Sequence, residues 1–375
     1  MKKTGTVFLN RVLPLIVTLV LLGTIILAAS FVTKEQIGPD ISNFYVRAKV
    51  TRVLEDHSAG ATATGPQRLE AEVLSGDCKG QICLLENPND YQIGAYAQEG
   101  TKVIALVKAG EDGSLKGSVY NYDRTGMVYL LLGLFAVVTI LVGGKKGIAT
   151  LYALIFTFVC VICMYIPLIY VGCNGILAAI LTATVILAAS IYIINGWSRK
   201  TLCAIIGTTT GVAISGLLAM ALGGGFHLSG YQTDDVESLV YIARFAKVQV
   251  GPILYAGVLI SSLGAVMDVS VSMVAAMDEL RQQSPELSGK AFFRSGMRVG
   301  KDMIGTMANT LILAYTGSAT GVIVSIYSYD MSYLRIMGEN SIVTEIFCGL
   351  CGTIGVILTV PIQALITTLM YRKAK

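Results

Sequence analysis

The clearest pattern along the chain is a series of long apolar runs separated by short polar connections. Runs of about 20 apolar residues have the length at which an α-helix crosses the hydrocarbon layer of a membrane. About eight runs reach this length, near residues 12–32, 127–143, 148–171, 175–195, 201–223, 250–277, 303–328 and 343–371. The sequence therefore predicts a polytopic α-helical membrane protein with about eight transmembrane helices.

Residues 33–124, between the first and second runs, follow a different pattern. They are polar and contain short alternating stretches such as "RLEAEVL" and "TKVIALVKAG", separated by Gly, Pro, Asn and Asp. Such stretches are typical of strands and turns. The pattern predicts about five strands in a small all-β module, either a barrel or a sandwich. The expected organisation is a membrane anchor at 1–32, the β module at 33–124 and a seven-span membrane domain at 125–375.

The first run has two interpretations. The basic start "MKK" and the small residues of "LAAS" are typical of a cleaved secretory signal. The apolar core of about 18 residues is longer than the usual core of a signal peptide and long enough to span, which favours an uncleaved anchor. Under both interpretations the β module lies outside the membrane.

The basic residues predict the orientation of the spans, because cytoplasmic connections are enriched in Lys and Arg. Every second connection is basic: Lys2, Lys3 and Arg11 precede the first run, Lys145 and Lys146 follow the second, and Arg199 and Lys200 follow the fourth. The chain ends in "YRKAK", and the intervening loops are acidic. This alternation predicts cytoplasmic termini and an extracytoplasmic β module.

The composition agrees with a membrane protein, since 54% of the residues are hydrophobic and 14% are charged. The formal net charge of +4 is too small to indicate nucleic-acid binding. One basic cluster has helical spacing and adjacent aromatic residues, and it comprises Lys290, Arg294, Arg298 and Lys301. It predicts an interfacial helix, starting near Ser284, that contacts the cytoplasmic leaflet. The alternative is a gate or a docking site for a soluble partner.

Two cysteines fall in the β module. Cys78 and Cys83 flank a Lys-Gly turn in "GDCKGQIC", in a compartment where disulfides persist. A Cys78–Cys83 disulfide is expected, and a pair of free thiols is the alternative. The two histidines, His57 and His227, lie far apart in the sequence, so neither a His-rich metal site nor a cofactor is expected.

The candidate site begins with an acid inside the sixth run. Asp268 lies about 16 Å from the cytoplasmic end of a helix through this run, well within the hydrocarbon. It shares a face of small or polar residues with Ser272, and the next run has a matching polar face with Thr306, Asn309 and Thr310. Two interpretations stay open. Asp268 takes up a proton or cation at an oxygen-lined site, or it is a neutral hydrogen bonder between helices.

Two blocks of the sequence resemble a known family. The segments "LGAVMDVSVSMVAAMDEL" and "SGMRVGKDMIGTMANTLILAYTG", together with "GGKKG" and "AIIGTTTG", are similar to the signature of the YibE/F family of multispanning bacterial membrane proteins. The resemblance implies a multi-pass protein of the bacterial cytoplasmic membrane. It implies no biochemical activity.

Three classes of function remain. A transporter or permease for a small solute or ion would use the Asp268 face as a coupling site. A non-transporting accessory, assembly or sensory protein would bind a partner through the β module or the basic segment. An intramembrane enzyme is disfavoured, because no nucleophile motif or paired catalytic carboxylates occur in the spans. The sequence favours the transporter, with the lipid bilayer and an unidentified solute or ion as its partners.

Overall fold

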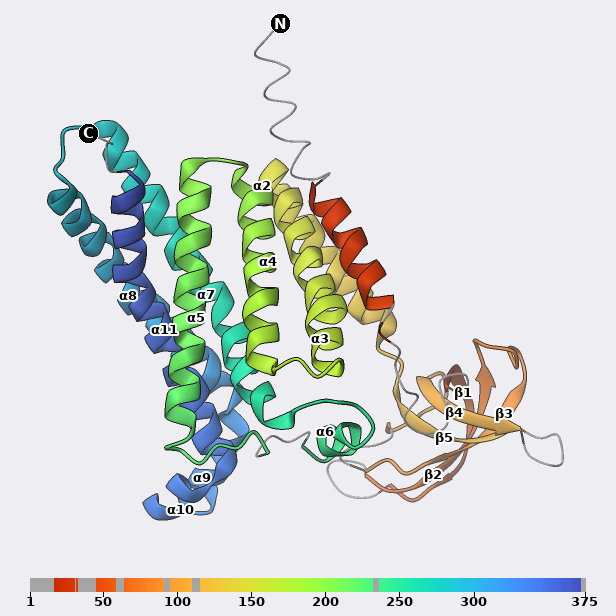
Figure 1. The fold of residues 1–375 in the computed structure, drawn as a ribbon. Helices are drawn as coiled ribbons and strands as arrows, with labels where there is room; N and C mark the ends of the chain where they lie inside the picture. The colour runs from red at the N-terminus through yellow and green to blue at the C-terminus, as the bar shows by residue number, and fades with distance from the viewer. Residues whose placement is uncertain are drawn as a thin grey trace, which may run out of the picture. The chain divides into compact units, whose positions relative to one another are not determined.

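A computed structural model gives the structure of the chain and describes residues 17–30, 32, 45–58, 64–90, 95–109, 115–231 and 236–371. The chain divides into two compact units (Figure 1). One unit spans Gln36–Leu141 and contains all five strands. The other combines Met1–Glu35 with Val142–Lys375 and is helical in its described part.

The strands form a closed barrel in the order β1-β2-β3-β5-β4. Their bounds are β1 Tyr45–Asp56, β2 Gln67–Val73, β3 Ile82–Asn87, β4 Lys102–Ala109 and β5 Leu115–Tyr122. Neighbouring strands are antiparallel except β3 and β5, which are parallel. This is the arrangement of the five-stranded Greek-key barrel known as the OB-fold. Of the two architectures that the alternation allowed, the structure is a barrel.

Alternate residues of the strands form the barrel core. Two buried side-chain amides, those of Gln67 and Asn87, connect this core to residues 95–97, which have no regular secondary structure. Leu69, Ala71 and Val73 of β2 are fully buried, as the alternation predicts. The Gln67 side chain accepts from Ala97 N at 3.0 Å, and the Asn87 amide donates to Ala95 O at 2.6 Å. Asn87 also donates to Gln67 Oε1 at 2.8 Å. The two amides thus satisfy backbone groups that a further strand would otherwise pair.

The expected disulfide is not formed in the structure. Both Cys78 and Cys83 are free thiols. Cys83 alternates into the barrel core, where its Sγ donates to Ala71 O at 3.2 Å, whereas Cys78 is half-buried in the turn before β3. The alternation of β3 therefore directs the Cys83 thiol into the core, whereas the Cys78 thiol stays in the turn, and the disulfide expected from their spacing does not form. Burial raises the pKa of the Cys83 thiol to about 11.

Because a thiol reacts as its thiolate, the two cysteines should differ in reactivity. In non-reduced, folded protein at neutral pH, we expect maleimide to modify Cys78 and to leave Cys83 unmodified until the protein is denatured. Mass spectrometry of the labelled peptides would measure this. If both thiols resist maleimide after denaturation and become reactive only after reduction, a disulfide is present and the structure is wrong at this turn.

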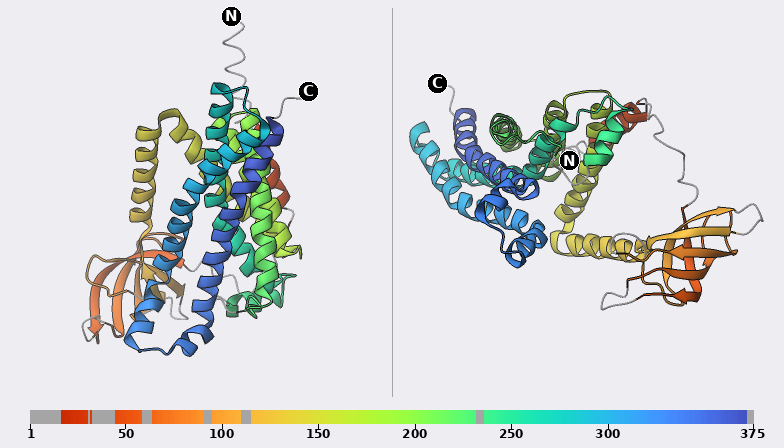
Figure 2. Two further views of the ribbon diagram at one scale, coloured as in Figure 1. Left: turned by 90° about the vertical axis from the view of Figure 1, so that its left-hand side faces the viewer. Right: turned by 90° about the horizontal axis from the view of Figure 1, so that it is seen from below.

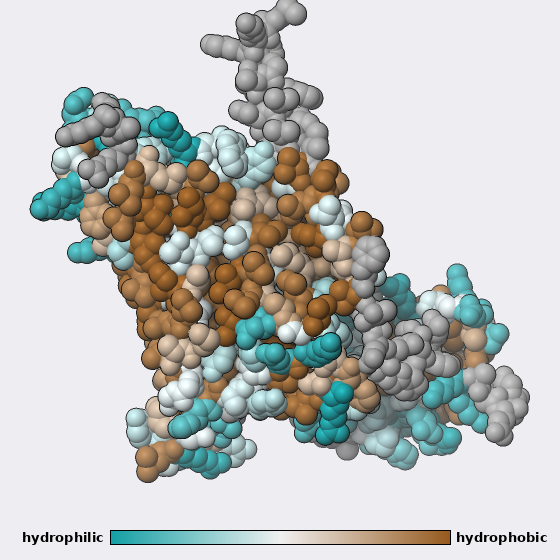
Figure 3. All heavy atoms as spheres, viewed as in Figure 1, coloured by the Kyte–Doolittle hydropathy of each residue, from teal (hydrophilic) through white to brown (hydrophobic). Residues whose placement is uncertain are grey.

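The helical unit contains long apolar helices. Their bounds, and those of the short helices between them, are α2 Thr125–Cys160, the π-helix Val161–Tyr165, α3 Ile166–Tyr170, α4 Gly175–Asn195, α5 Arg199–Gly223, α6 Val236–Ala243, α7 Val250–Gln283, α8 Gly289–Ser318, α9 Thr320–Ser328, α10 Tyr333–Gly338 and α11 Asn340–Met370. Within the described residues, five helical stretches are long and apolar enough to cross a membrane, or six if α8 and α9 form one bent span. Hydrophobic side chains cover the bundle between two hydrophilic ends (Figure 3). This belt is typical of a membrane protein.

Two of the predicted runs are joined in the structure. The stretch Thr125–Tyr170 is continuous over 46 residues, about 69 Å, which is more than twice the hydrocarbon thickness of about 30 Å. Its backbone is not helical at Gly144, where φ is 55° and ψ is −129°. Glycine reaches this conformation without strain. The break falls between the predicted runs 127–143 and 148–171.

The first predicted run is represented by a shorter helix. The described helix Val17–Ser30 is apolar, and residues 12–16 of the run lie outside the described residues. The hydroxyls of Thr18 and Tyr152 lie 3.3 Å apart, so this helix packs beside the second half of α2 within the helical unit (Figure 1).

The basic segment predicted to form an interfacial helix is the first part of a longer helix, α8. The helix starts at Gly289, where the Ser288 hydroxyl accepts from Ala291 N at 3.3 Å, and it continues without interruption to Ser318. No proline lies between these bounds, so nothing stops the helix at the hydrocarbon boundary. The break lies instead at Ala319, where α9 departs at 63°. The polar start and the apolar remainder of α8 are one helix beside α11 (Figure 2).

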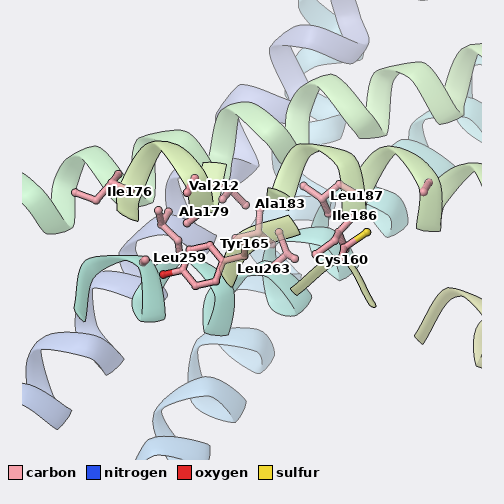
Figure 4. Close-up of a cluster of buried hydrophobic side chains, with 14 of the residues drawn as sticks. Cys160, Tyr165, Ile176, Ala179, Ala183, Ile186, Leu187, Val212, Leu259 and Leu263 are labelled. Atoms are coloured by element: carbon pink, nitrogen blue, oxygen red, sulfur yellow. The ribbon is translucent and has the colours of Figure 1, made fainter. Parts of the chain in front are cut away.

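The centre of the helical unit is held by close contacts between α5 and α11. Gly207 faces Gln363, Gly211 faces Thr359, and Gly355 faces Ser215, each so closely that a Cβ on the glycine would overlap the opposite side chain. In hydrocarbon, helices associate through such small residues because apolar burial gives no net gain. Helix α7 contacts both α5 and α11, and its side chains Leu259 and Leu263 pack with side chains of α4 and α2 (Figure 4).

The contact between α5 and α11 can be tested with two matched Gly→Ala variants. Gly207→Ala should lower the melting temperature of the protein in detergent by several degrees, because the new methyl group overlaps the buried Gln363 amide. Gly224→Ala, at the end of α5, has no atom within 4 Å of its Cβ and should melt like the parent chain. Equal melting temperatures for the two variants would contradict this packing.

Candidate functional site

The face of α7 that carries Asp268 points away from the packed bundle. Residues three or four apart on this face are all exposed and are small or polar: Gly257, Ser261, Gly264, Asp268, Ser272, Ala275 and Glu279. The opposite face holds Val266, Ser270 and Met273, which are fully buried in the bundle. Asp268 lies about 27 Å from the Val250 end of the helix and about 22 Å from the Gln283 end. A carboxylate therefore sits near mid-helix on an open, polar face, named here the α7 polar face.

The polar side chains of α8 are also exposed, but two of them are already hydrogen-bonded within the helix. Thr306 Oγ1 donates to Met303 O at 3.0 Å, and Thr310 Oγ1 donates to Thr306 O at 2.8 Å. Asn309 is exposed on the same helix. These hydroxyls stabilise α8 locally and keep their lone pairs available to another group.

The antiparallel packing of α7 and α8 fixes which residues share a level. Gly296 lies against Met277, Gly300 lies against Met273, and the Ser261 and Tyr315 hydroxyls are 2.6 Å apart. Interpolation between these contacts places Asp268 level with Gly305 and Thr306.

The structure does not bring Asp268 into contact with Asn309 or Thr310. Among the described residues Asp268 has no hydrogen-bond or ion-pair partner, and no atom lies within 4 Å of a Cβ built at Gly264 or Gly305. Asp268 and Thr306 thus lie at about one level, and the predicted residues are exposed without closing around a ligand in this single chain.

A second polar group, which the sequence interpretation missed, lies toward the α9–α10 end of the bundle. Ser261 Oγ donates to Val258 O at 3.0 Å, which leaves the Tyr315 hydroxyl to donate to Ser261 Oγ. Glu345 of α11 lies beside Tyr315. These side chains come from α7, α8 and α11, and they bring a carboxylate, a phenol and an alcohol together within an apolar region.

Two cavities, each of about 280 Å³, share Tyr315 and Glu345 in their walls. The first lies between α8, α9 and α11 and is lined mainly by apolar residues, of which five are isoleucines. The second, named here the Glu345 cavity, lies between α6, α7, α8 and α11 and also includes Ser261 and Thr344. Glu345 was overlooked because it falls two positions inside the last predicted run, where an acid reads as a loop residue. An acid inside an otherwise apolar run is the feature of the sequence that could have identified Glu345 as a candidate site residue.

The basic end of the bundle is organised around Asp278. The Tyr371 hydroxyl donates to Asp278 Oδ1 at 2.6 Å, and Lys200 Nζ lies 3.6 Å from Asp278 Oδ2. Arg281 donates to Tyr371 O at 3.1 Å and stacks over the Phe292 ring, 4.5 Å from its centroid. These contacts join the ends of α5, α7, α8 and α11.

The predicted basic segment lies on α8 beside this junction. Its four cationic residues are all exposed and recur along one face, and they are Lys290, Arg294, Arg298 and Lys301. The same turns of α8 bury Phe292 and Gly296 on the opposite face. The segment is therefore an amphipathic helix start whose cations face outward.

The barrel also presents exposed aromatic and basic groups. The rings of Tyr45 and Tyr120 meet edge to face at 5.5 Å. Arg47 lies 3.7 Å from Asp123, whose carboxylate accepts from Thr125 N at 3.1 Å and so caps the start of α2. The hydrogen bonds from Thr125, aided by the Arg47 charge, hold the pKa of Asp123 below its usual value.

In the part of the chain that the structure describes, no three His, Cys, Asp or Glu side chains come together as a metal site would require. The cavity beside Glu345 and the exposed face at Asp268 are each built on one carboxylate and several hydroxyls, and Gly257 and Ser261 belong to both.

Comparison with known proteins identifies the family to which the helical unit is similar. No curated protein and no solved structure matches the chain significantly. One family model does match, that of the YibE/F-like proteins, and it covers residues 131–373, which is nearly the whole helical unit from α2 to the end of α11. Because the match spans more than half of the chain, the chain belongs to the YibE/F-like family.

Proposed function

We propose that this protein is a membrane transporter or permease for a small solute or ion, with Asp268 as the group that couples movement to a proton or cation. The α7 polar face is the main observation in favour. A carboxylate near the middle of a spanning helix is costly against lipid, so such residues generally face water or protein. An exposed face of small and polar residues along α7, beside the polar side chains of α8, is suited to line an aqueous path.

The proposal includes a topology. Eight spans, with both termini in the cytoplasm of a bacterial cell and the barrel outside the cytoplasmic membrane, agree with the distribution of Lys and Arg. The break at Gly144 supports counting two spans in Thr125–Tyr170, and the bend at Ala319 supports a broken span in α8 and α9. Broken helices are common near the sites of secondary transporters.

An accessory or sensory role is the second candidate. The observation that favours it is the barrel, which is a compact unit with its own core and an exposed pair of tyrosines. OB-type barrels bind ligands on their outer face, although a fold alone does not fix a function. In that case the helical unit would anchor the barrel and the α7 polar face would contact another chain.

The topology can be tested with two introduced cysteines. Ser328→Cys, at the end of α9, and Glu286→Cys, between α7 and α8, lie at opposite ends of the bundle and are exposed. In intact cells, we expect a membrane-impermeant maleimide to label Ser328→Cys above the level of the parent chain and to label Glu286→Cys only after permeabilisation. Labelling of both positions in intact cells would contradict the eight-span scheme.

The role of Asp268 can be tested by Asp268→Asn, which keeps the size and hydrogen bonding of the side chain but removes the charge. Full-length protein would be reconstituted in vesicles containing a pH-sensitive dye, and proton movement would be recorded while Na⁺ and K⁺ gradients are imposed. We expect the wild type to couple proton movement to at least one gradient and Asp268→Asn to abolish the coupling.

The matched control is Glu279→Gln, which removes a carboxylate from the same face of α7 near its end. This variant should retain the wild-type coupling. A folded Asp268→Asn protein with unchanged coupling would overturn the role of Asp268, and its higher thermal stability would then identify Asp268 as a structural hydrogen bonder.

A further inference from the structure

The first turns of α8 carry a row of positive charges. Residues 289–301 include four cationic side chains and no acid. All four are exposed, and none forms an ion pair or a side-chain hydrogen bond within the described part of the chain; they are Lys290, Arg294, Arg298 and Lys301. They extend over about 17 Å of helix. The described residues therefore supply no direct counter-charge to this row.

This row lies alongside α11 rather than beyond its end. The two helices pack side by side (Figure 1). A Cβ built on Gly289 would lie 3.9 Å from Thr368 of α11, and a Cβ built on Gly300 would meet Val360. The basic segment is therefore level with residues 360–368, which include no charged side chain and belong to a helix apolar enough to cross a membrane.

The side of α8 that carries the two arginines borders α11. Arg294 lies about five turns before Ile312, so both side chains project from the same side of the helix. Arg298 and Thr316 have the same relation. Ile312 and Thr316 line a cavity together with Leu350 of α11. This side of α8 therefore borders the flank of α11 that carries Leu350.

That flank of α11 is apolar and exposed. Leu350, Ile354 and Leu365 lie on it by helical periodicity, and their exposed fractions are 49%, 36% and 51%. Leu365 is level with the basic segment, whereas Leu350 lies about 22 Å farther along the helix. The surface thus has positive charge at one end and exposed apolar side chains that continue away from it.

We propose that the basic segment and this flank of α11 bind an anionic phospholipid. The phosphate accepts hydrogen bonds from the guanidinium groups, the two lysines add attraction, and an acyl chain lies along the apolar flank. A soluble anion would leave the flank uncovered, and an uncharged lipid would leave the cations without a counter-charge. The proposal concerns the lipid surroundings of the protein and does not depend on transport.

The test measures lipid binding to the full-length protein. Native mass spectrometry of the protein in detergent would compare phosphatidylglycerol with phosphatidylcholine of the same acyl chains, each added over a range of concentrations. We expect the wild type to bind phosphatidylglycerol at least about tenfold more tightly. Because one cation near a lipid surface contributes about fivefold, Arg294→Gln combined with Arg298→Gln should weaken phosphatidylglycerol binding by more than about tenfold and leave phosphatidylcholine binding unchanged.

The matched control is Lys145→Gln combined with Lys146→Gln, which removes the same charge from exposed positions on α2. This variant should keep the wild-type affinity for phosphatidylglycerol. Both double variants should melt like the wild type, since the arginines have no partner within the described residues. Equal affinity of the wild type for the two lipids, or an equal loss in both double variants, would overturn the proposal.

Two soluble competitors separate a lipid from other anions. Glycerol 3-phosphate has the phosphate without acyl chains, and polyglutamate resembles an acidic protein segment. Neither should displace phosphatidylglycerol at an equal concentration of charge. Displacement by glycerol 3-phosphate would overturn the proposal in favour of a soluble-anion site, and displacement by polyglutamate alone would overturn it in favour of a docking site for an acidic protein.

Discussion

The close approach of α5 and α11 is the constraint on which the helical unit depends. Lipid chains are as apolar as leucine, so burying apolar side chains does not hold spanning helices together as it does in water. Glycines allow a different kind of contact, because the helices can approach closely where a side chain is missing. Gly207, Gly211 and Gly355 lie directly against Gln363, Thr359 and Ser215 of the opposite helix. The interface then gains van der Waals contacts and a buried hydrogen bond, which the Gln363 side-chain amide donates from Nε2 to Cys203 O at 3.1 Å.

This pair positions the helices that carry the polar groups. Both α7 and α8 pack on α11, and Gly352 of α11 meets Ser262 of α7 and Leu311 of α8. Three helices thus converge, which brings Tyr315 to Ser261 and to Glu345, while the outer face of α7 is left uncovered. At the basic end, Asp278 and Tyr371 tie the same helices again. The Glu345 cavity and the α7 polar face are consequences of one packing arrangement.

Local patterns in the sequence predicted local structure well and tertiary contacts poorly. The alternation of Leu69, Ala71 and Val73 identified a buried strand, since period two is a property of the strand itself. The apolar run predicted from residue 303 lies inside a helix that already begins at Gly289, because hydropathy marks where apolar residues begin and gives no reason for a helix to start or stop there. Glu345 was missed for a related reason. Its polar neighbours, Tyr315 and Ser261, come from two other helices, and no window along the chain contains all three residues.

The two carboxylates differ in ways that bear on how such a protein could work. Asp268 lies on an exposed face whose neighbours, Gly264 and Ser272, are small, so no side chain of these neighbours covers it. Glu345 lies in the wall of a cavity of about 280 Å³, beside a hydrogen-bonded phenol. The two carboxylates lie on different helices, and α7 contributes to both places, since it carries Ser261 in the wall of the Glu345 cavity and Asp268 on its exposed face. A change in the tilt of α7 would therefore alter the surroundings of both groups at once, and the proposed proton-coupled transport would need a physical link of this kind.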